Sequence, residues 1–181
     1  MDPLTEQQRH ANMAAIHGKD TKPEMVVRKW LWGQGFRYRL NHPRLPGKPD
    51  IVMRKYRTCI FVNGCFWHGH LIPNESLELS VESLEKIDNS ACCKIPKTNR
   101  EFWVAKIRRN QERDLRVQQE LAAMGWHCIT IWECELKPKV REKTLESLVY
   151  TLNKIFLQDH SIRHYEMPEE ESMMAAEEAG V

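Results

Sequence analysis

The feature that most constrains this chain is a stripe of side chains between residues 99 and 124, where alternating steps of four and three residues place its members on one face of a helix. The stripe consists of Trp103, Ile107, Asn110, Asp114, Val117, Leu121 and Met124. Asn110 and Asp114 interrupt an otherwise apolar face, and a buried carboxylate is costly unless it has a partner. The pattern predicts a long helix that packs inward, with Asp114 either serving a site or held by Arg or backbone amides.

Helical and β patterns alternate around this stripe. Helices are predicted over residues 5–16, from the capping box Thr21-x-x-Glu24 to Gly33 or Gly35, over 99–124 and over 142–157. The last of these helices carries Leu145, Leu148, Leu152 and Phe156 on one face. Strands are predicted over residues 36–40, 50–53, 58–63 and 127–133, of which the second and third form a hairpin. The order helix–helix–strand–strand–strand–helix–strand–helix predicts an α/β fold in which helices flank one mixed β-sheet.

The length of 181 residues suits one α/β domain. We place this domain at residues 1–160, with a Ser- and Glu-rich insertion at 71–91 and an acidic tail at 161–181 that is expected to be disordered. No apolar run approaches the roughly 18 residues that a membrane span needs, and the polar N-terminus lacks the apolar stretch of a signal peptide. We therefore expect a cytoplasmic protein that does not enter a membrane.

The net charge of +2 conceals an uneven distribution. All 27 Lys and Arg residues precede Glu166, whereas 6 of the 25 Asp and Glu residues lie between Glu166 and Val181, so residues 1–165 carry a net charge of +8. A surface this basic can meet the phosphates of nucleic acid, although charge alone fits an ordinary solvated surface equally well.

The segment Cys65-Phe-Trp-His68-Gly-His70 carries three residue types that bind Zn²⁺. In an extended segment His68 and His70 would share one side. A closed zinc site needs four ligands: Cys65 and His70 supply two, Cys134 at a strand end a third, and Cys92 or Cys93 the fourth. The alternative is a set of free buried thiols, which is what we expect of Cys59 and Cys128 within the β runs.

Asp50 begins a β run directly after Pro-Gly-Lys-Pro, where its carboxylate is well placed to bind Mg²⁺, although Asp is also common in such turns. If zinc takes Cys65 and His70, then His68 is left beside Asp50 and Asp114, and a free imidazole near carboxylates can act as a general base. The aromatic residues nearby are candidates to stack on DNA bases, although one of them, Trp103, fits the core at least as well.

Six segments in order resemble the very-short-patch repair (Vsr) endonucleases. They are RHANMAAIHGKDTKPE (9–24), PGKPDIV (46–52), IFVNGCFWHGH (60–70), PKTNREFW (96–103), NQERD (110–114) and GWHCITIWEC (125–134). The likeness covers about residues 9–134, and the combination GCFWHGH, EFW and WEC is highly specific.

This resemblance implies a restriction-endonuclease-like fold with a structural zinc site, and a Mg²⁺-dependent nicking reaction. The bond cut would lie 5′ to the T of a T·G mismatch left by deamination of 5-methylcytosine. The substrate would be double-stranded DNA, bound by a monomer because one mismatch has no two-fold symmetry. Whether a mismatch-repair protein assists stays open.

Carried over position by position, the resemblance assigns a role to each candidate residue. Asp50 and the backbone carbonyl of Val62 would bind Mg²⁺, His68 would activate the attacking water, and Asp114 and Glu24 would support the site. Zinc would lie on Cys65, His70, Cys92 and Cys134. Phe66, Trp67 and Trp103 would enter the duplex from one groove and Met13 from the other.

The sequence departs from the family pattern in three places. Val62-Asn63 stands where some members carry Thr-His, residues 71–91 separate His70 from its next Cys partner, and the acidic tail lies outside the likeness. Two other functions therefore remain under consideration. One is a zinc-stabilised DNA-binding protein without nuclease activity, and the other is a restriction-like nuclease with a different target.

Overall fold

A four-stranded mixed sheet forms the centre of the computed structural model, which describes residues 5, 7–8, 11, 19–72, 92–96 and 98–161. The elements in chain order are α2 (Lys22–Gly33), β1 (Arg39–Leu40), β2 (Ile51–Met53), η1 (Arg54–Tyr56), β3 (Thr58–Asn63), α4 (Arg100–Ala123), β4 (His127–Trp132), η3 (Glu133–Leu136) and α5 (Arg141–Asp159). Strands β1, β2 and β3 are antiparallel neighbours, whereas β4 runs parallel to β3. The predicted α/β fold with helices around one mixed sheet is confirmed.

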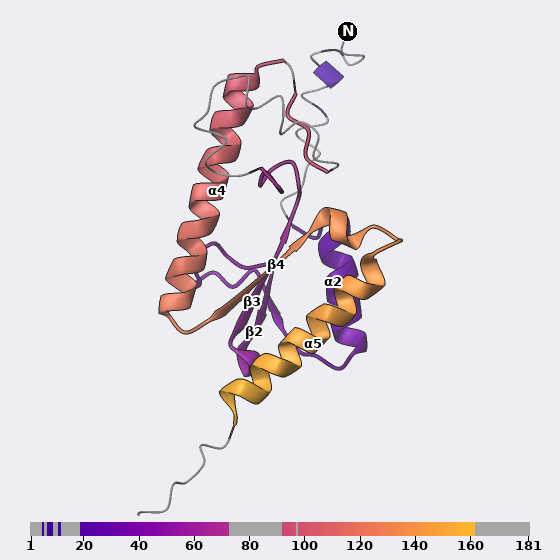
Figure 1. Cartoon of the computed structure of the whole chain (residues 1–181), viewed down its shortest axis with the longest axis vertical. Helices are drawn as coiled ribbons and strands as arrows, with labels where there is room; N and C mark the ends of the chain where they lie inside the picture. The colour runs from indigo at the N-terminus through magenta and orange to yellow at the C-terminus, as the bar shows by residue number, and fades with distance from the viewer. Residues whose placement is uncertain are drawn as a thin grey trace, which may run out of the picture.

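Helices cover both faces of this sheet (Figure 1). Helix α4 lies on one side, and α2 and α5 lie together on the other. Side chains from α2 and α5 bury Ile51, Met53, Ile60 and Ile131 beneath them. On the opposite face Val117 and Leu121 of α4 pack with Val52 and Cys59. Alternate residues of β2 and β3 thus face different cores, so every position of these short central strands is apolar or neutral.

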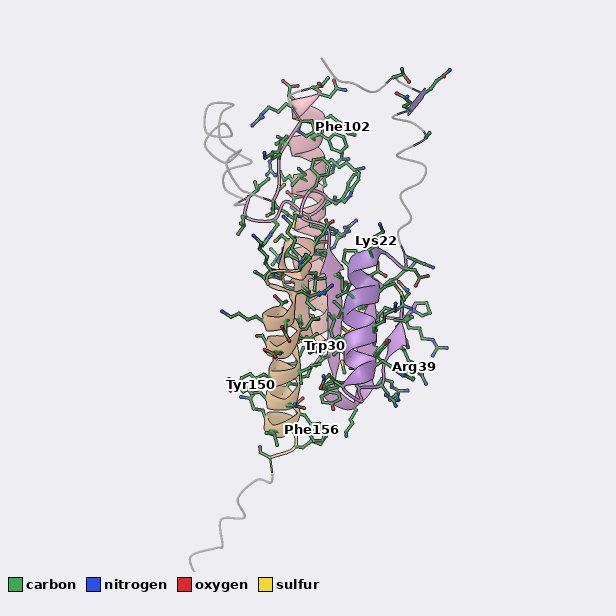
Figure 2. The ribbon with its side chains drawn as sticks, turned by 90° about the vertical axis from the view of Figure 1, so that its right-hand side faces the viewer. Lys22, Trp30, Arg39, Phe102, Tyr150 and Phe156 are labelled. Carbon is green, nitrogen blue, oxygen red and sulfur yellow. The ribbon has the colours of Figure 1, made fainter. Side chains whose placement is uncertain are left out.

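Helix α4 contains the predicted stripe but ends before its last member. Ile107, Val117 and Leu121 are buried, whereas Met124 caps the helix and is 47% exposed. In α5, Ile155 takes the last core position, while Phe156 is half-buried and packs on Tyr56. Figure 2 shows Phe102 near the start of α4 and Phe156 near the end of α5.

The strand predicted over residues 36–40 is too long. Only Arg39 and Leu40 pair with β2, because Phe36 turns into the core against Tyr56, with 5.3 Å between ring centroids. The remaining predictions for the insertion and tail fall almost entirely outside the described residues, as does most of the predicted helix over 5–16. No helix in the described part of the chain is both long and apolar enough to span a bilayer.

One end of the sheet gathers the ends of several elements. The parallel pairing of β3 and β4 continues to Asn63 beside Trp132. Strand β2 begins at Ile51, opposite Ile60, so β3 extends past it at this end. The segment that precedes β2 and the turn that follows β3 therefore meet here, which brings together residues that lie far apart in the sequence.

Candidate active site and metal cluster

Two carboxylates occupy the end of the sheet. The Asp50 side chain accepts a hydrogen bond from the Val62 backbone N–H at 2.8 Å, just beyond the end of the β2–β3 pairing. Glu24, only 4% exposed, accepts hydrogen bonds from the Asp20 backbone N–H at 3.0 Å and from the Thr21 hydroxyl at 2.8 Å. Thr21 caps α2 as predicted and accepts from the Glu24 N–H at 3.4 Å, but Glu24 reaches back to the Asp20 N–H rather than to that of Thr21, so the predicted capping box forms only in part. These bonds fix an acidic side chain at the site.

The pKa of Asp50 is raised from 3.8 to about 6, chiefly by burial and also by repulsion from Glu24. The Val62 N–H, His68 and Arg28 lower the pKa of Asp50, but together they do not outweigh these two effects. A carboxylate that is desolvated beside another acid favours a proton or a cation. The position therefore suits a divalent metal ion, for which hard oxygen ligands are typical.

His68 reaches the site from the turn that follows β3, and its partner comes from α4. The imidazole Nδ1 lies 2.5 Å from an Asp114 carboxylate oxygen, although 46 residues separate the two in sequence. Their side chains are 21% and 24% exposed, so the pair borders solvent. With Nδ1 bonded to a carboxylate, the other ring nitrogen is the one available to exchange a proton.

Asp50, Glu24, His68 and Asp114 all line one cavity of about 780 Å³. The cavity wall also includes the basic residues Lys48, Lys106 and Arg113, and the acidic Glu133. Acidic groups thus lie beside cationic ones that can attract phosphate. The prediction singled out the four residues named first and missed the other four. For Arg113 the sequence held one signal, namely its position directly before Asp114, at the border of the inner stripe.

Polar side chains of α4 hold the turn that carries His68. Asn110 donates to the Trp67 carbonyl at 2.7 Å, and Gln111 donates to the carbonyls of Gly69 and Ile72 at 3.1 and 2.9 Å. Asn110, which interrupts the stripe, and its neighbour Gln111 thus satisfy backbone carbonyls that would otherwise lack partners. Because residues 65–70 form turns rather than a strand, His68 and His70 enter separate clusters and do not share one side.

Four potential metal ligands meet on the other side of this turn. The Nδ1 atom of His70 lies 3.7 Å from the sulfur of Cys65 and 3.3 Å from those of Cys92 and Cys134. All four ligand atoms lie within 4.8 Å of one another. A tetrahedral ion with bonds of about 2.0–2.3 Å holds its ligands roughly 3.5–3.8 Å apart, so the cluster has the dimensions of a metal site.

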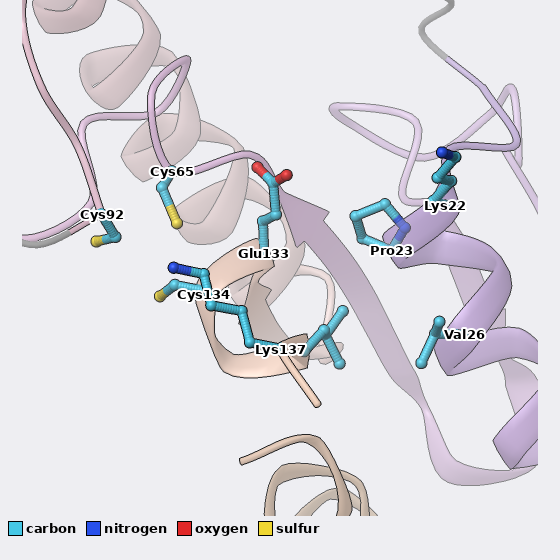
Figure 3. Close-up of a pocket in the computed structure, with 9 residues that line it drawn as sticks. Lys22, Pro23, Val26, Cys65, Cys92, Glu133, Cys134 and Lys137 are labelled. Atoms are coloured by element: carbon cyan, nitrogen blue, oxygen red, sulfur yellow. The ribbon is translucent and has the colours of Figure 1, made fainter. Parts of the chain in front are cut away.

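Cys92 and Cys93, the two candidates for the fourth ligand, lie in different surroundings. Cys92 is half-buried within the cluster, whereas Cys93 is 1% exposed and packs with Ile72 and Ile107. The His70 ring stacks on Trp132 at 4.1 Å between centroids. Figure 3 shows the three cluster cysteines on one side of a pocket of about 410 Å³, opposite Lys22, Pro23 and Val26 of α2.

Aromatic rings form a third group beside the cavity. The rings of Phe66, Trp67 and Trp103 contact one another edge to face, with centroids 5.0–6.0 Å apart. All three are half-buried, and Phe102, which is exposed, extends the group by a contact with Trp103. Trp103 also packs on the small core of Ile72, Cys93, Ile95 and Ile107, so it has a structural role in addition to its contacts within this group. Met13 lies outside the described residues.

Comparison with known proteins matches these features to one family. The family model for the DNA mismatch endonuclease Vsr matches residues 1–73. A type II nicking enzyme of Neisseria meningitidis, V.NmeAIP, is 46% identical over 140 residues, which cover 76% of this chain and 86% of the relative. The DNA mismatch endonuclease Vsr of Escherichia coli is 38% identical over 147 residues, or 81% of each chain. The type II nicking enzyme V.XorIIP of Xanthomonas oryzae is 37% identical, over 75% of this chain and 86% of the relative.

The chain belongs to the Vsr family of DNA mismatch endonucleases. The resemblance read from the sequence motifs is therefore confirmed, and with it the expectation of a DNA endonuclease. In this Vsr-family chain the turn over residues 65–70, directly after β3, carries a functional candidate or an anchor at nearly every position.

Substitution of Gly69 tests how closely that turn fits α4. Gly69 has a φ of +62°, and a Cβ atom there would lie 2.5 Å from Ile107 Cγ2 and 2.8 Å from Gln111 Nε2. We expect Gly69→Ala to lower the free energy of unfolding by roughly 1–3 kcal/mol, because strain and overlap add. Chemical denaturation measures this change.

Gly33→Ala is the matched control, since a Cβ at Gly33, the last residue of α2, meets nothing within 4 Å. That substitution should leave the stability unchanged or raise it by up to about 1 kcal/mol. Equal effects of the two substitutions would contradict the close fit of the turn.

Proposed function

We propose that this chain hydrolyses one phosphodiester bond 5′ to the T of a T·G mismatch that arises from deamination of 5-methylcytosine. The reaction would depend on Mg²⁺, use His68 as the general base and take place on a restriction-endonuclease-like fold. The observation that carries this proposal is the single cavity in which the Asp50–Glu24 group faces the His68–Asp114 pair. The names of the relatives, which include a mismatch endonuclease and several nicking enzymes, support the substrate and the single cut.

Asp50 and the carbonyl of Val62 are the proposed Mg²⁺ ligands, with Glu24 supporting the site. One Asp50 oxygen accepts the Val62 N–H, and within the described residues the other accepts no hydrogen bond. The N–H and C=O of an extended residue point to the same edge of its strand, so the Val62 carbonyl is directed toward the Asp50 carboxylate. A bound Mg²⁺ would supply positive charge to the scissile phosphate.

His68 and Asp114 are the proposed proton-transfer residues. Asp114 accepts the Nδ1 hydrogen, which orients the ring and leaves the Nε2 lone pair free. Nε2 would take a proton from the attacking water as its oxygen bonds to phosphorus, and the bond to the departing sugar oxygen would then break. The carboxylate stabilises the imidazolium that forms, as in other His–Asp pairs.

We propose that the aromatic group recognises the mismatch. Phe66, Trp67 and Trp103 form a compact apolar edge beside the cavity, and Met13 would approach from the opposite groove. Aromatic wedges unstack base steps, and the cost is lower at a poorly paired T·G step than in a regular duplex. A protein that reads one asymmetric mismatch has no need of a two-fold axis, so we propose a monomer, with a mismatch-repair protein as a further candidate partner.

The Cys65–His70–Cys92–Cys134 cluster is proposed to bind Zn²⁺. Three sulfurs and one imidazole form a donor set typical of structural zinc sites, and burial raises the pKa of the Cys65 thiol to about 12, so its thiolate needs a cation nearby. The ion would join the turn after β3 to η3 and to residue 92, at the end of the insertion.

A nicking assay tests the central residues. On a labelled duplex with one T·G mismatch, the parent should make one Mg²⁺-dependent cut 5′ to the mismatched T. Asp50→Asn should abolish this cut, because the proposed metal ligand loses its charge. His68→Ala should slow it by roughly 10²–10⁴-fold, the usual contribution of a general base.

His127→Ala is the matched control, since His127 lies at the opposite end of β4 and pairs with Asp159. It should nick within about two-fold of the parent. Mismatch binding without a cut under any divalent metal would leave the DNA-binding alternative. Equal cutting of paired duplexes would instead favour a restriction-like nuclease with another target.

The zinc content of two variants shows whether Cys92 or Cys93 is the fourth ligand. Cys92→Ser should remove one ligand and markedly weaken metal retention, whereas Cys93→Ser should keep one bound zinc per chain despite some loss of stability. Elemental analysis and the absorption spectrum of the Co²⁺-substituted protein measure both. Full zinc retention by Cys92→Ser together with loss by Cys93→Ser would reverse the assignment.

The raised pKa of Asp50 predicts a stability that depends on pH when no Mg²⁺ is added. Folding favours the protonated carboxyl, so this contribution is present below about pH 4 and is lost as the pH rises through about 6. Asp50→Asn removes the effect. The melting temperature of the Asn variant should therefore rise relative to that of the parent between pH 4 and 7, and added Mg²⁺ should narrow the gap. A constant difference across this range would contradict the pKa shift.

A further inference from the structure

Arg113 contacts the carboxylate that orients His68. One Asp114 oxygen bonds His68, and the other lies 3.2 Å from a terminal nitrogen of Arg113. Arg113 is three residues after Asn110 and four before Val117, so it borders the inner face of α4, and it lines the proposed catalytic cavity. Its side chain is 50% exposed. The guanidinium is thus both held by Asp114 and partly open to solvent.

The guanidinium of Arg113 can donate more hydrogen bonds than the one that it makes to Asp114. It carries five N–H donors in a planar fork, and in the described part of the chain the only partner of Arg113 is Asp114. The fork matches two phosphate oxygens at once, which the ammonium groups of Lys48 and Lys106 in the same cavity cannot do. Lys106 also lies 6.0 Å from the Phe102 ring centroid, toward the aromatic group.

We propose that Arg113 binds the phosphate that is to be cut and stabilises the negative charge that develops on it, with Asp114 holding the guanidinium in place before DNA arrives. This inference rests on the proposed function. It gives Asp114 two tasks, since one oxygen orients the proton acceptor and the other positions a cation for the phosphate. A cation fixed in advance does not have to reorganise during the reaction, which is where such groups contribute most.

A duplex with one neutral linkage provides the test. The T·G duplex is prepared with ordinary phosphates or with a methylphosphonate at the proposed cleavage position, and binding is measured by fluorescence anisotropy without added Mg²⁺. Arg113→Gln should weaken binding to the ordinary duplex by about ten-fold, typical of one charged hydrogen bond, and should cause no further loss on the neutral linkage. An equal loss on both duplexes, or none on either, overturns the proposal.

Arg116→Gln is the matched control, because Arg116 is 70% exposed, pairs with Glu120 and does not line the cavity. It removes the same charge and should affect both duplexes equally. Nicking at saturating DNA adds a second measurement. Arg113→Gln should slow it by roughly 10²–10³-fold and Arg113→Lys by less.

Nicking by Arg113→Gln within about three-fold of the parent would overturn the proposal, provided that its melting temperature and zinc content match the parent's. If the parent protein binds the mismatch without nicking it, the proposed function is wrong, whereas the Arg113 proposal is not yet decided. The comparison of the two duplexes would still decide whether Arg113 contacts this phosphate.

Discussion

The structure of the site depends on the attachment of the turn after β3 to the inner face of α4. Asn110 and Gln111 donate to three carbonyls on either side of His68, in a region where backbone groups without partners would be costly. These bonds fix the path of the turn, and the path directs His68 toward Asp114 and His70 toward the three thiols. The His68–Asp114 pair and the Cys65–His70–Cys92–Cys134 cluster can therefore be built on two histidines that lie two residues apart, without sharing a side chain. Gly69, between the two histidines, permits the close approach to α4 that this division requires.

The cavity wall carries acidic groups close to one another and also several basic groups, so like charges repel within each set. Burial and Glu24 raise the pKa of Asp50, so the carboxylates alone destabilise their surroundings at neutral pH. The Val62 N–H, His68 and Arg28 lower the pKa of Asp50, but it stays near 6. A divalent cation between these acids and a phosphate beside these bases would each relieve repulsion within its own group. Under the proposed function, the repulsion among these carboxylates lowers stability and favours the binding of a cation, which is the usual exchange of stability for activity.

Much of the fold could be predicted from the sequence because periodicity reports burial directly. The α4 stripe, the β2–β3 hairpin and the Thr21 N-cap of α2 all rest on local patterns, and all are present. The errors arose where tertiary contacts override local pattern: Phe36 leaves the strand register to fill the core, and residues 65–70 turn although their composition allows a strand. For the site, Asp114 was recognisable because a charge interrupted an apolar face. Lys48, Lys106 and Glu133 were not, since a charged residue in a polar segment gives no sign of the cavity that it lines.

Asn63 is where this chain departs most from the family pattern within the cavity itself. It is 8% exposed and lines the same wall as His68, but an amide does not titrate near neutral pH and cannot relay a proton. Under the proposed mechanism, His68 is then the only imidazole that the described residues contribute to the cavity wall. The pair that it forms with Asp114 is about one-fifth exposed on each side, so the proton can pass directly to solvent without a second histidine. Val62 in place of Thr is compatible with the same mechanism. The proposed ligand there is a backbone carbonyl, which is present whatever the side chain is.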